Sequence, residues 1–229
     1  MNLYDYVTEP DLDIRLGPRP YLHPVRTLAG TVVTDALPFD HPWHLGASLT
    51  MADVNGWNLW GGRTFVDGEG YVWREDHGRI RHLTPEDLVW EDGEGRTLLT
   101  ERRRIAATAS ADGWELSFSY ALTAPHEVTL GSPATNGRTG GAGYGGFFWR
   151  CPPGQAVASA ENGSADPALT LTTDSYRLTF TGLRDADRWF LRTDDYIGVC
   201  AALAYTDPLV IPAGETIHRD IRVRIEDVH

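Results

Sequence analysis

The chain of 229 residues carries 20 basic residues, all of them arginine, against 32 acidic residues, so its formal net charge is −12. Such an acidic chain repels nucleic acid and anionic membranes, and we expect neither as a partner. No apolar run approaches the ~20 residues of a membrane-spanning helix. Residues 1–16 carry too many charges for the apolar core of a signal peptide, so we expect a cytoplasmic protein.

Three of the eight histidines lie on short proline-containing segments near the start of the chain. His23 lies within residues 19–24, and Asp40, His41 and His44 fall within five residues of one another. Histidine is the side chain best suited to proton transfer or metal ligation near neutral pH. A group of histidines on predicted loops therefore indicates a functional site.

The orientation of His41 relative to His44 depends on the local backbone. Pro42 restricts His41 to extended geometry, and in a regular strand the two imidazoles would point to opposite faces. A turn would instead bring them together, as an acid–base pair or as two metal ligands, with Asp40 fixing a tautomer. The alternative is one functional histidine beside one structural histidine. We predict His41, His44, Asp40 and His23 as catalytic residues.

Aromatic residues are concentrated in the same half of the chain, where five of the eight tryptophans lie: Trp43, Trp57, Trp60, Trp73 and Trp90. Aromatic rings with scattered polar side chains are typical of a sugar-binding cleft, because ring faces stack on C–H groups. Most large aromatics of a β-protein nonetheless lie in its core. We predict that Trp60 and Asn55 bind substrate, with Asn55 holding substrate oxygens.

Residues 78–82 have the alternation of a strand, with Arg79 and Arg81 on one face and Ile80 and His82 on the other. A histidine on an apolar face is either buried and hydrogen-bonded or directed into a pocket. We predict the second arrangement and assign His82 to substrate binding.

Residues 84–90 are predicted as the only helix, with Thr84 able to cap it and Pro85 at its first position. Elsewhere a period of two dominates, and Asn-Gly and Asp-Gly turns separate the runs. The pattern predicts further strands at residues 113–122, 168–173, 175–181, 196–205 and 216–225. Residues 196–205 are apolar enough for burial on both faces. We expect an all-β fold, a single-domain antiparallel β-sandwich spanning residues 1–229.

The glycine-rich residues 139–146 are expected to form a loop beside a site, or a bulged strand that a ligand approaches. Tyr144 in this segment and Arg150 after it are predicted to bind substrate. Arg150 would clamp an anion or a hydroxyl group, and the alternative is a surface ion pair. For Cys151 and Cys200 the alternative is a disulfide, but in a cytoplasmic protein we expect two free buried thiols.

Several motifs together resemble one family, the PmoA family of bacterial proteins of unknown function. They are residues 19–24, 40–46, 54–60 and 78–82, the Tyr144-Gly145-Gly146 segment with Arg150, and residues 212–215. The family's second motif usually reads Asp-His-Pro-His-His-Arg-Gly, and this chain has Trp43 and Leu45 in it, which implies a divergent substrate. The resemblance implies a setting in carbohydrate metabolism. The family name refers to methane oxygenase, a membrane copper protein, which a chain without a membrane-length apolar run cannot be.

The entry into the last strand, residues 212–215, also resembles sandwich domains of the galactose-mutarotase type. That likeness implies a related fold. It does not imply mutarotase activity, because the Glu-Thr-Gln segment that carries the base of those enzymes is missing here.

Three functions are consistent with these patterns. The first is an enzyme that acts on a carbohydrate or sugar-like metabolite by histidine acid/base chemistry, as an isomerase, lyase or hydrolase. The second is a non-catalytic carbohydrate-binding protein, which needs stacking aromatics but not several imidazoles. The third is a metal-dependent enzyme with zinc or iron held by His23, His41 and His44, with Asp40 or His82 as a further candidate ligand.

No known metal-ligand motif matches the histidine spacing, so we assign no metal ligand and expect no cofactor, with zinc or iron at the histidines as the alternative. The expected partner is a small molecule or a carbohydrate, and the oligomeric state is left open. We further predict that His23, His41, His44 and His82 line one cavity, with Trp60 and Tyr144 on its rim.

Overall fold

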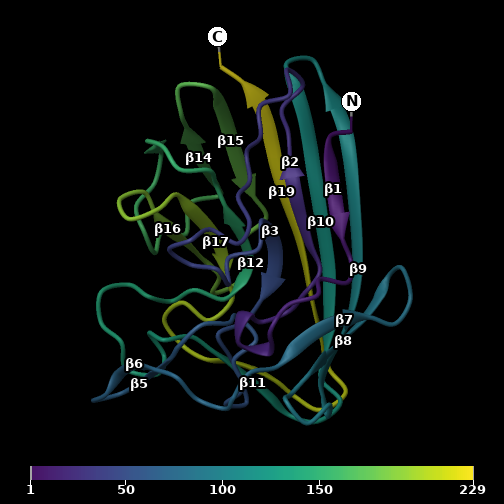
Figure 1. The fold of residues 1–229 in the computed structure, drawn as a ribbon, viewed down its shortest axis with the longest axis vertical. Coiled ribbons are helices and arrows are strands. Elements are labelled where there is room, and N and C mark those ends of the chain that lie inside the picture. The colour runs from purple at the N-terminus through teal and green to yellow at the C-terminus, as the bar shows by residue number, and fades with distance from the viewer. Residues whose placement is uncertain (1, 229) are drawn as a thin grey trace.

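The protein, described over residues 2–228 in a computed structural model, is built almost entirely from antiparallel strands (Figure 1). The larger sheet contains, in spatial order, β13 (Val157–Ala158), β14 (Ala168–Thr172), β15 (Tyr176–Thr181), β19 (Thr216–Asp227), β10 (Gly113–Thr123), β9 (Thr97–Ser110), β8 (Asp87–Glu91) and β7 (Arg79–His82). The smaller sheet contains β1 (Tyr4–Val7), β2 (Tyr21–Val25), β3 (Ala47–Thr50), β12 (Gly146–Arg150), β17 (Gly198–Ala202) and β16 (Arg188–Arg192).

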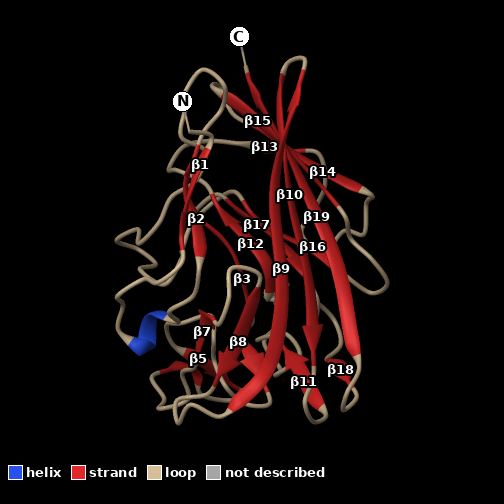
Figure 2. Ribbon diagram, turned by 90° about the vertical axis from the view of Figure 1, so that its right-hand side faces the viewer, coloured by secondary structure: helices blue, strands red, loops and turns tan. Residues whose placement is uncertain are grey.

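Two short sheets lie near the end of the molecule opposite the chain termini (Figure 1). One contains β18 (Leu209–Ile211), β11 (Val128–Gly131) and β4 (Asp53–Val54), and the other pairs β5 (Thr64–Val66) with β6 (Gly70–Val72). The two large sheets form the layers of a sandwich, with the long strands β9, β10 and β19 on one side (Figure 2). The predicted all-β antiparallel sandwich is confirmed.

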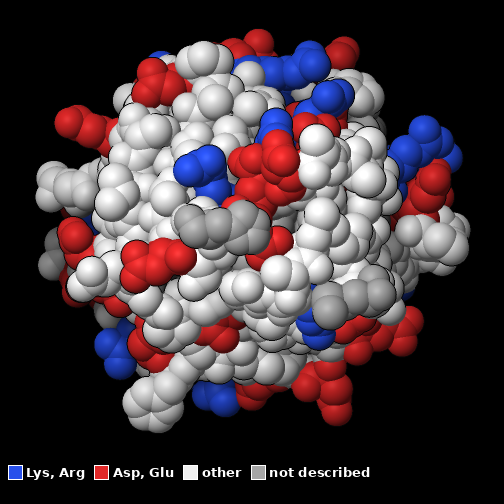
Figure 3. All heavy atoms as spheres, turned by 90° about the horizontal axis from the view of Figure 1, so that it is seen from above, with Lys and Arg blue, Asp and Glu red and all other residues white. Residues whose placement is uncertain are grey.

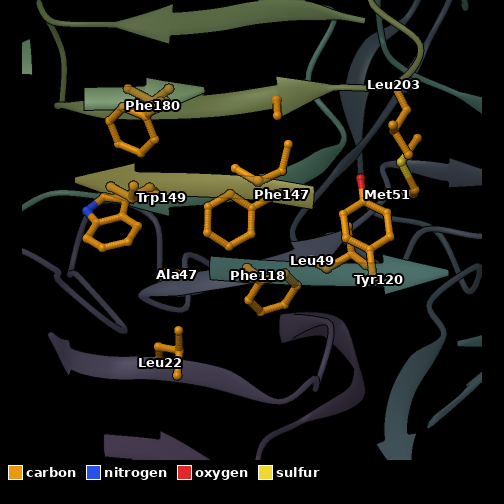
Figure 4. Packing of buried hydrophobic residues seen from close by; sticks show 14 of the residues in the cluster. Leu22, Ala47, Leu49, Met51, Phe118, Tyr120, Phe147, Trp149, Phe180 and Leu203 are labelled. Atoms are coloured by element: carbon orange, nitrogen blue, oxygen red, sulfur yellow. The ribbon is translucent and has the colours of Figure 1, made fainter. Parts of the chain in front are cut away.

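The core lies between the two large sheets and follows from the alternation in the sequence. Along β10, the residues Trp114, Leu116, Phe118, Tyr120 and Leu122 are all buried. Across the core, Phe147 of β12 packs on Phe118 with ring centroids 4.7 Å apart, and Trp149 lies 5.8 Å from Phe180 of β15 (Figure 4). One buried cluster joins these rings to residues from Leu22 to Ile225.

The same alternation gives the smaller sheet a second, outer face. Phe148 lies between the core residues Phe147 and Trp149, so its ring points away from the larger sheet. On the neighbouring β17, Gly198 and Cys200 leave room for that ring; a Cβ atom at Gly198 would lie 3.1 Å from it. The outer face therefore carries its own aromatic cluster, and the candidate site is built there.

The helix predicted at residues 84–90 is wrong. The main chain of Leu83 donates to the carbonyl of Asp87 at 2.8 Å, and Thr84 Oγ1 accepts from the main chain of Asp87 at 3.0 Å. Thr84 therefore closes the β7–β8 hairpin turn, and the β-branched and aromatic residues Val89 and Trp90 continue as a strand. Within residues 2–228 the only helical element is a single 3₁₀ turn, Ile14–Leu16.

The other sequence-based elements agree with the structure. The strands predicted at residues 78–82, 113–122, 168–173, 175–181 and 216–225 correspond to β7, β10, β14, β15 and β19. Strand β17 is buried at all five positions, as its apolar composition predicted. Cys151 and Cys200 are both buried free thiols.

The surface has a mixed character. At the end of the molecule where both chain termini lie, arginine and acidic side chains are interspersed rather than gathered by sign (Figure 3). No helix in the described part of the chain is long and apolar enough to cross a membrane.

Candidate functional site

A cavity of about 440 Å³ lies against the outer face of the smaller sheet. Its walls come from four separate parts of the chain: residues 41–44, 60–73, 138–144 and 190–196. Long-range strand pairing brings them together, since β12 lies between β3 and β17 and β16 follows at the edge. Loops held on a rigid sheet are where functional side chains concentrate in proteins.

A tight turn sets the two histidines side by side. The main chain of His44 donates to the carbonyl of His41 at 2.9 Å, which closes a four-residue turn with Pro42 at its second position. The two imidazoles stack with centroids 4.7 Å apart and an interplanar angle of 14°. The sequence left open whether a strand or a turn joins the two histidines, and the structure has the turn.

Asp40 orients the His41 ring. His41 Nδ1 donates to Asp40 Oδ2 at 2.7 Å, and Arg150 Nη2 donates to both carboxylate oxygens at 2.9 and 3.0 Å. Burial alone would raise the pKa of Asp40, but the hydrogen bonds from His41 and Arg150 outweigh burial and hold that pKa below its ordinary value. An ionised carboxylate only accepts, so the proton of neutral His41 is on Nδ1 and Nε2 keeps its lone pair.

Arg150 fixes the opposite tautomer on His44. Its Nη1 lies 3.2 Å from His44 Nδ1, and because guanidinium only donates, this nitrogen must be the acceptor. Neutral His44 therefore carries its proton on Nε2. His41 and His44 both line the cavity, and in their neutral forms His41 keeps a lone pair on Nε2 whereas His44 carries an N–H group there.

His44 is held neutral by its surroundings. Its pKa lies well below the ordinary value, first because the ring is buried and then because His41, Arg150 and Arg19 contribute positive charge around it. Only about 2% of the residue is exposed. The His44 ring therefore acts as a fixed hydrogen-bond donor near neutral pH, not as a second exchangeable proton.

This depressed pKa predicts a pH-dependent stability. As pH falls below about 6.5, the unfolded chain takes up a proton at His44 that the folded chain does not, so the free energy of unfolding decreases. The limiting slope for one proton is about 1.4 kcal/mol per pH unit. We expect the His44→Gln variant to lose stability less steeply than the wild type between pH 6.5 and 5, measured by urea denaturation. The exposed His126→Gln variant is the matched control, and equal slopes for wild type and His44→Gln would contradict the prediction.

Arg19 forms hydrogen bonds with two segments that make up walls of the cavity, at Trp43 and at Trp60. It is fully buried, and its guanidinium donates to the carbonyls of Trp43 and Trp60 at 3.0 Å and to Ser48 Oγ on β3 at 3.0 Å. Burial lowers the pKa of Arg19 to about 9, so the group stays charged at neutral pH. Within the described chain no carboxylate lies within ion-pair distance of it, so main-chain carbonyl oxygens and the Ser48 hydroxyl position this cation.

Aromatic rings form much of the cavity wall. Trp60 lies 4.6 Å from Tyr144 and 4.8 Å from Phe148, and Tyr196 lies 5.1 Å from His41. Trp43 packs against Gly62, whose φ of 74° favours glycine; a Cβ atom there would lie 2.6 Å from the indole. Of the five tryptophans noted in the sequence, Trp43, Trp60 and Trp73 line the cavity.

Six of the nine predicted site residues belong to this site. His41, His44, Trp60 and Tyr144 line the cavity, and Asp40 and Arg150 lie directly behind the histidines. Arg150 forms an ion pair with Asp40, and only about 4% of the arginine side chain is exposed. The contact is therefore not the surface ion pair considered as the alternative. Arg150 contacts the two residues that orient the imidazoles.

His23 and His82 do not line the cavity, and the prediction of four imidazoles around one cavity is corrected here. His23 Nδ1 contacts Thr34 Oγ1 at 3.0 Å on β2, and burial lowers its pKa. His82 Nε2 contacts Tyr6 OH at 2.7 Å, and its Nδ1 lies 2.9 Å from the carbonyl of Thr84. Both rings form hydrogen bonds with neighbouring residues. This is the structural role that the sequence analysis gave as the alternative for a buried histidine on a strand.

Asn55 also lies away from the cavity. Its φ is 52°, its Oδ1 accepts from the main chain of Thr129 at 2.7 Å, and its Nδ2 donates to the carbonyl of Glu127 at 3.2 Å. The side chain therefore fixes a turn against β11 and does not line the cavity, although the sequence analysis predicted that it holds substrate oxygens.

The three-imidazole metal site does not assemble. Within residues 2–228 no three histidine, cysteine, aspartate or glutamate side chains are grouped as a metal ion requires. The nearest approach to such a group, Asp40 with His41 and His44, has the Arg150 guanidinium in contact with Asp40 and His44. A fixed positive charge at that point disfavours a cation.

Several residues that line the cavity were not predicted as site residues from the sequence. They are Arg63, Tyr71, Arg138, Phe190, Arg192, Asp195 and Tyr196. Arg138 directly precedes the glycine-rich segment, residues 139–146, and this position was the one available indication in the sequence. The others lie within or next to the strands β5, β6, β16 and β17, and only the tertiary structure reveals that they line the same cavity as the histidines.

The fold and the site together define an antiparallel β-sandwich with a histidine- and aromatic-lined cavity on the outer face of one sheet. The chain belongs to a family of unknown function, DUF6807, whose sequence profile matches residues 1–229. Neither a curated protein sequence nor a solved structure matches the chain.

Proposed function

We propose that the protein is an enzyme that acts on a carbohydrate or sugar-like metabolite by proton transfer, with His41 as the acid or base. The observation that carries the proposal is the hydrogen bond from His41 Nδ1 to Asp40, which leaves Nε2 for a bound molecule in the cavity. His44, neutral and with its proton on Nε2, donates a hydrogen bond to a substrate oxygen. The reaction is an isomerisation, an elimination or a hydrolysis.

The aromatic walls support a sugar-like substrate. Trp43 and Trp73 line the cavity with partly exposed rings that can contact C–H groups, and a cavity of about 440 Å³ suits a molecule of monosaccharide to disaccharide size. The motif resemblance to the PmoA family, with its setting in carbohydrate metabolism, supports the same class of substrate.

The test is incubation of the protein with a panel of sugars and sugar acids in D₂O, followed by proton NMR. Proton transfer at carbon gives exchange of a substrate C–H for deuterium, and hydrolysis or elimination gives new resonances. We expect at least one compound to change with wild-type protein and to stay unchanged with the His41→Ala variant. Conversion that does not depend on His41 would refute this assignment.

A non-catalytic carbohydrate-binding protein is the second candidate, and the aromatic walls favour it equally. A binding protein has no need of two imidazoles with opposite tautomers at one point of its cavity. If a sugar binds to the wild type and to His41→Ala alike and is recovered unchanged, the binding role is correct.

A further inference from the structure

Positive charge is concentrated in the cavity of an acidic protein. Arg63, Arg138 and Arg192 line the cavity, against a single lining carboxylate, Asp195, while the whole chain has 32 acidic residues and 20 arginines. Most arginines of the chain lie within 4.0 Å of a carboxylate, as Arg150 and Arg219 do. No carboxylate of the described residues lies within that distance of the three cavity arginines.

Neutral groups hold Arg192 in place. Its Nη1 donates to the carbonyl of Leu191 at 3.0 Å and its Nη2 to the carbonyl of Gly141 at 3.4 Å. The guanidinium lies 4.5 Å from the centroid of the Phe190 ring, which also lines the cavity. Carbonyls and a ring face orient the cation but leave its charge uncompensated.

Arg138 is held in a similar way. Its Nη1 donates to Tyr71 OH, which lies 3.0 Å from Tyr144 OH, and its guanidinium lies 4.8 Å from the Tyr71 ring centroid. Arg138 thus directly precedes the glycine-rich segment, residues 139–146, and Arg192 contacts that segment at Gly141. Two half-buried guanidinium groups are therefore fixed against one loop, both at the cavity.

We infer that the substrate of this cavity carries an oxyanion, a carboxylate or a phosphate group, which Arg138 and Arg192 bind; the inference rests on the proposed function. The planar guanidinium fork matches both oxyanions, and several of its N–H groups are not used by the protein. Because the chain as a whole repels anions, a local excess of arginine in a cavity has its clearest use in drawing an anion there. A neutral sugar would leave these charges unmatched.

The test uses matched sets of probes in titration calorimetry. Each set has a neutral sugar, its uronate and its 6-phosphate: D-glucose, D-glucuronate and glucose 6-phosphate, and the same three derivatives of galactose. We expect at least one anion to bind about 10- to 100-fold more tightly than its neutral parent, because hydrogen bonds to a charged group contribute a binding free energy that corresponds to this ratio of affinities. Added salt should reduce that difference. A preference for the uronate identifies a carboxylate substrate, and a preference for the 6-phosphate identifies a phosphate.

Arginine variants assign the effect to the cavity. Arg192→Met and Arg138→Met should each remove about tenfold or more of the affinity for the anion and leave that for the neutral sugar unchanged. Arg177→Met is the matched control, because this arginine is exposed on β15 and away from the cavity. If no anion binds more tightly than its neutral parent, including the case in which no probe binds, the inference is wrong. It is also wrong if Arg177→Met weakens anion binding as much as Arg192→Met.

Calorimetry together with the D₂O incubation separates this inference from the proposed function. Conversion of a neutral sugar that depends on His41, without any preference for an anion, overturns the inference and keeps the acid–base function. Tight, Arg192-dependent binding of an anion that is recovered unchanged overturns the acid–base function and supports the anion site.

Discussion

The His41→Ala variant is expected to lower kcat for the substrate of the cavity by about 10²–10⁴-fold, the usual contribution of a positioned general acid or base. About 32% of the His41 side chain is exposed and its ring lies at the cavity, so its loss should not unfold the protein. Substrate affinity should change much less than kcat, because Trp60, Tyr144 and the cavity arginines remain. Steady-state kinetics with a substrate found in the sugar panel, together with calorimetric binding, measures both quantities.

Two further variants make this result specific. Asp40→Asn should approach the loss caused by His41→Ala, because an amide can donate to Nδ1 and would then leave the proton of His41 on Nε2. His82→Ala is the control, since His82 contacts Tyr6 away from the cavity, and its kcat should stay within about twofold of the wild type. The assignment fails if His41→Ala keeps full turnover, or if His82→Ala loses as much.

The sequence predicted the sandwich because alternation reports burial directly. The five apolar residues of one face of β10, from Trp114 to Leu122, are all buried. In β17 the apolar run predicted burial on both faces, and small residues such as Gly198 and Cys200 make that possible. Both signals lie within a single strand, so no knowledge of its neighbours was required.

Strand β9 shows where this reasoning fails. It is the longest strand, but its three consecutive arginines, Arg102 to Arg104, break the apolar alternation. Arg102 and Arg104 are exposed, whereas Arg103 faces the interior and is 2% exposed. The sequence cannot distinguish a buried arginine from its exposed neighbours, because only the carboxylate that pairs with it makes its burial possible.

For the candidate site too, the sequence predicts what depends on local structure and misses what depends on tertiary structure. The pairing of His41 with His44 needs only a four-residue turn, so the sequence could offer it as an alternative. His23 and His82 are histidines as well, but they lie on strands and form hydrogen bonds with residues of neighbouring segments. Arg63 and Arg138 lie on loops and Arg192 ends β16, so the cavity arginines are far apart in sequence and only the tertiary structure brings them together.

The largest effect on stability is expected at the buried ion pair of β9. Glu101 and Arg103 lie on the inner side of the strand, with side-chain exposures of 0% and 2%. Arg103 Nε and Nη2 donate to the two oxygens of Glu101 at 2.6 and 2.9 Å, and Trp90 Nε1 donates to the same carboxylate at 2.8 Å. Arg103 Nη1 also donates to Tyr6 OH at 3.0 Å, so the pair links the larger sheet to β1 of the smaller one.

Arg103→Met should lower the free energy of unfolding by about 3–5 kcal/mol, because it leaves the Glu101 carboxylate buried without a counter-charge. Arg102→Met is the matched control: Arg102 is the neighbouring residue, 63% of its side chain is exposed, and its ion pair with Glu86 should contribute at most about 1 kcal/mol. Removing both charges in Glu101→Gln/Arg103→Met should restore part of the loss, since no buried charge then lacks a partner. Urea denaturation of the three variants measures these differences. If Arg103→Met is no less stable than Arg102→Met, the buried pair does not stabilise the contact between the two sheets.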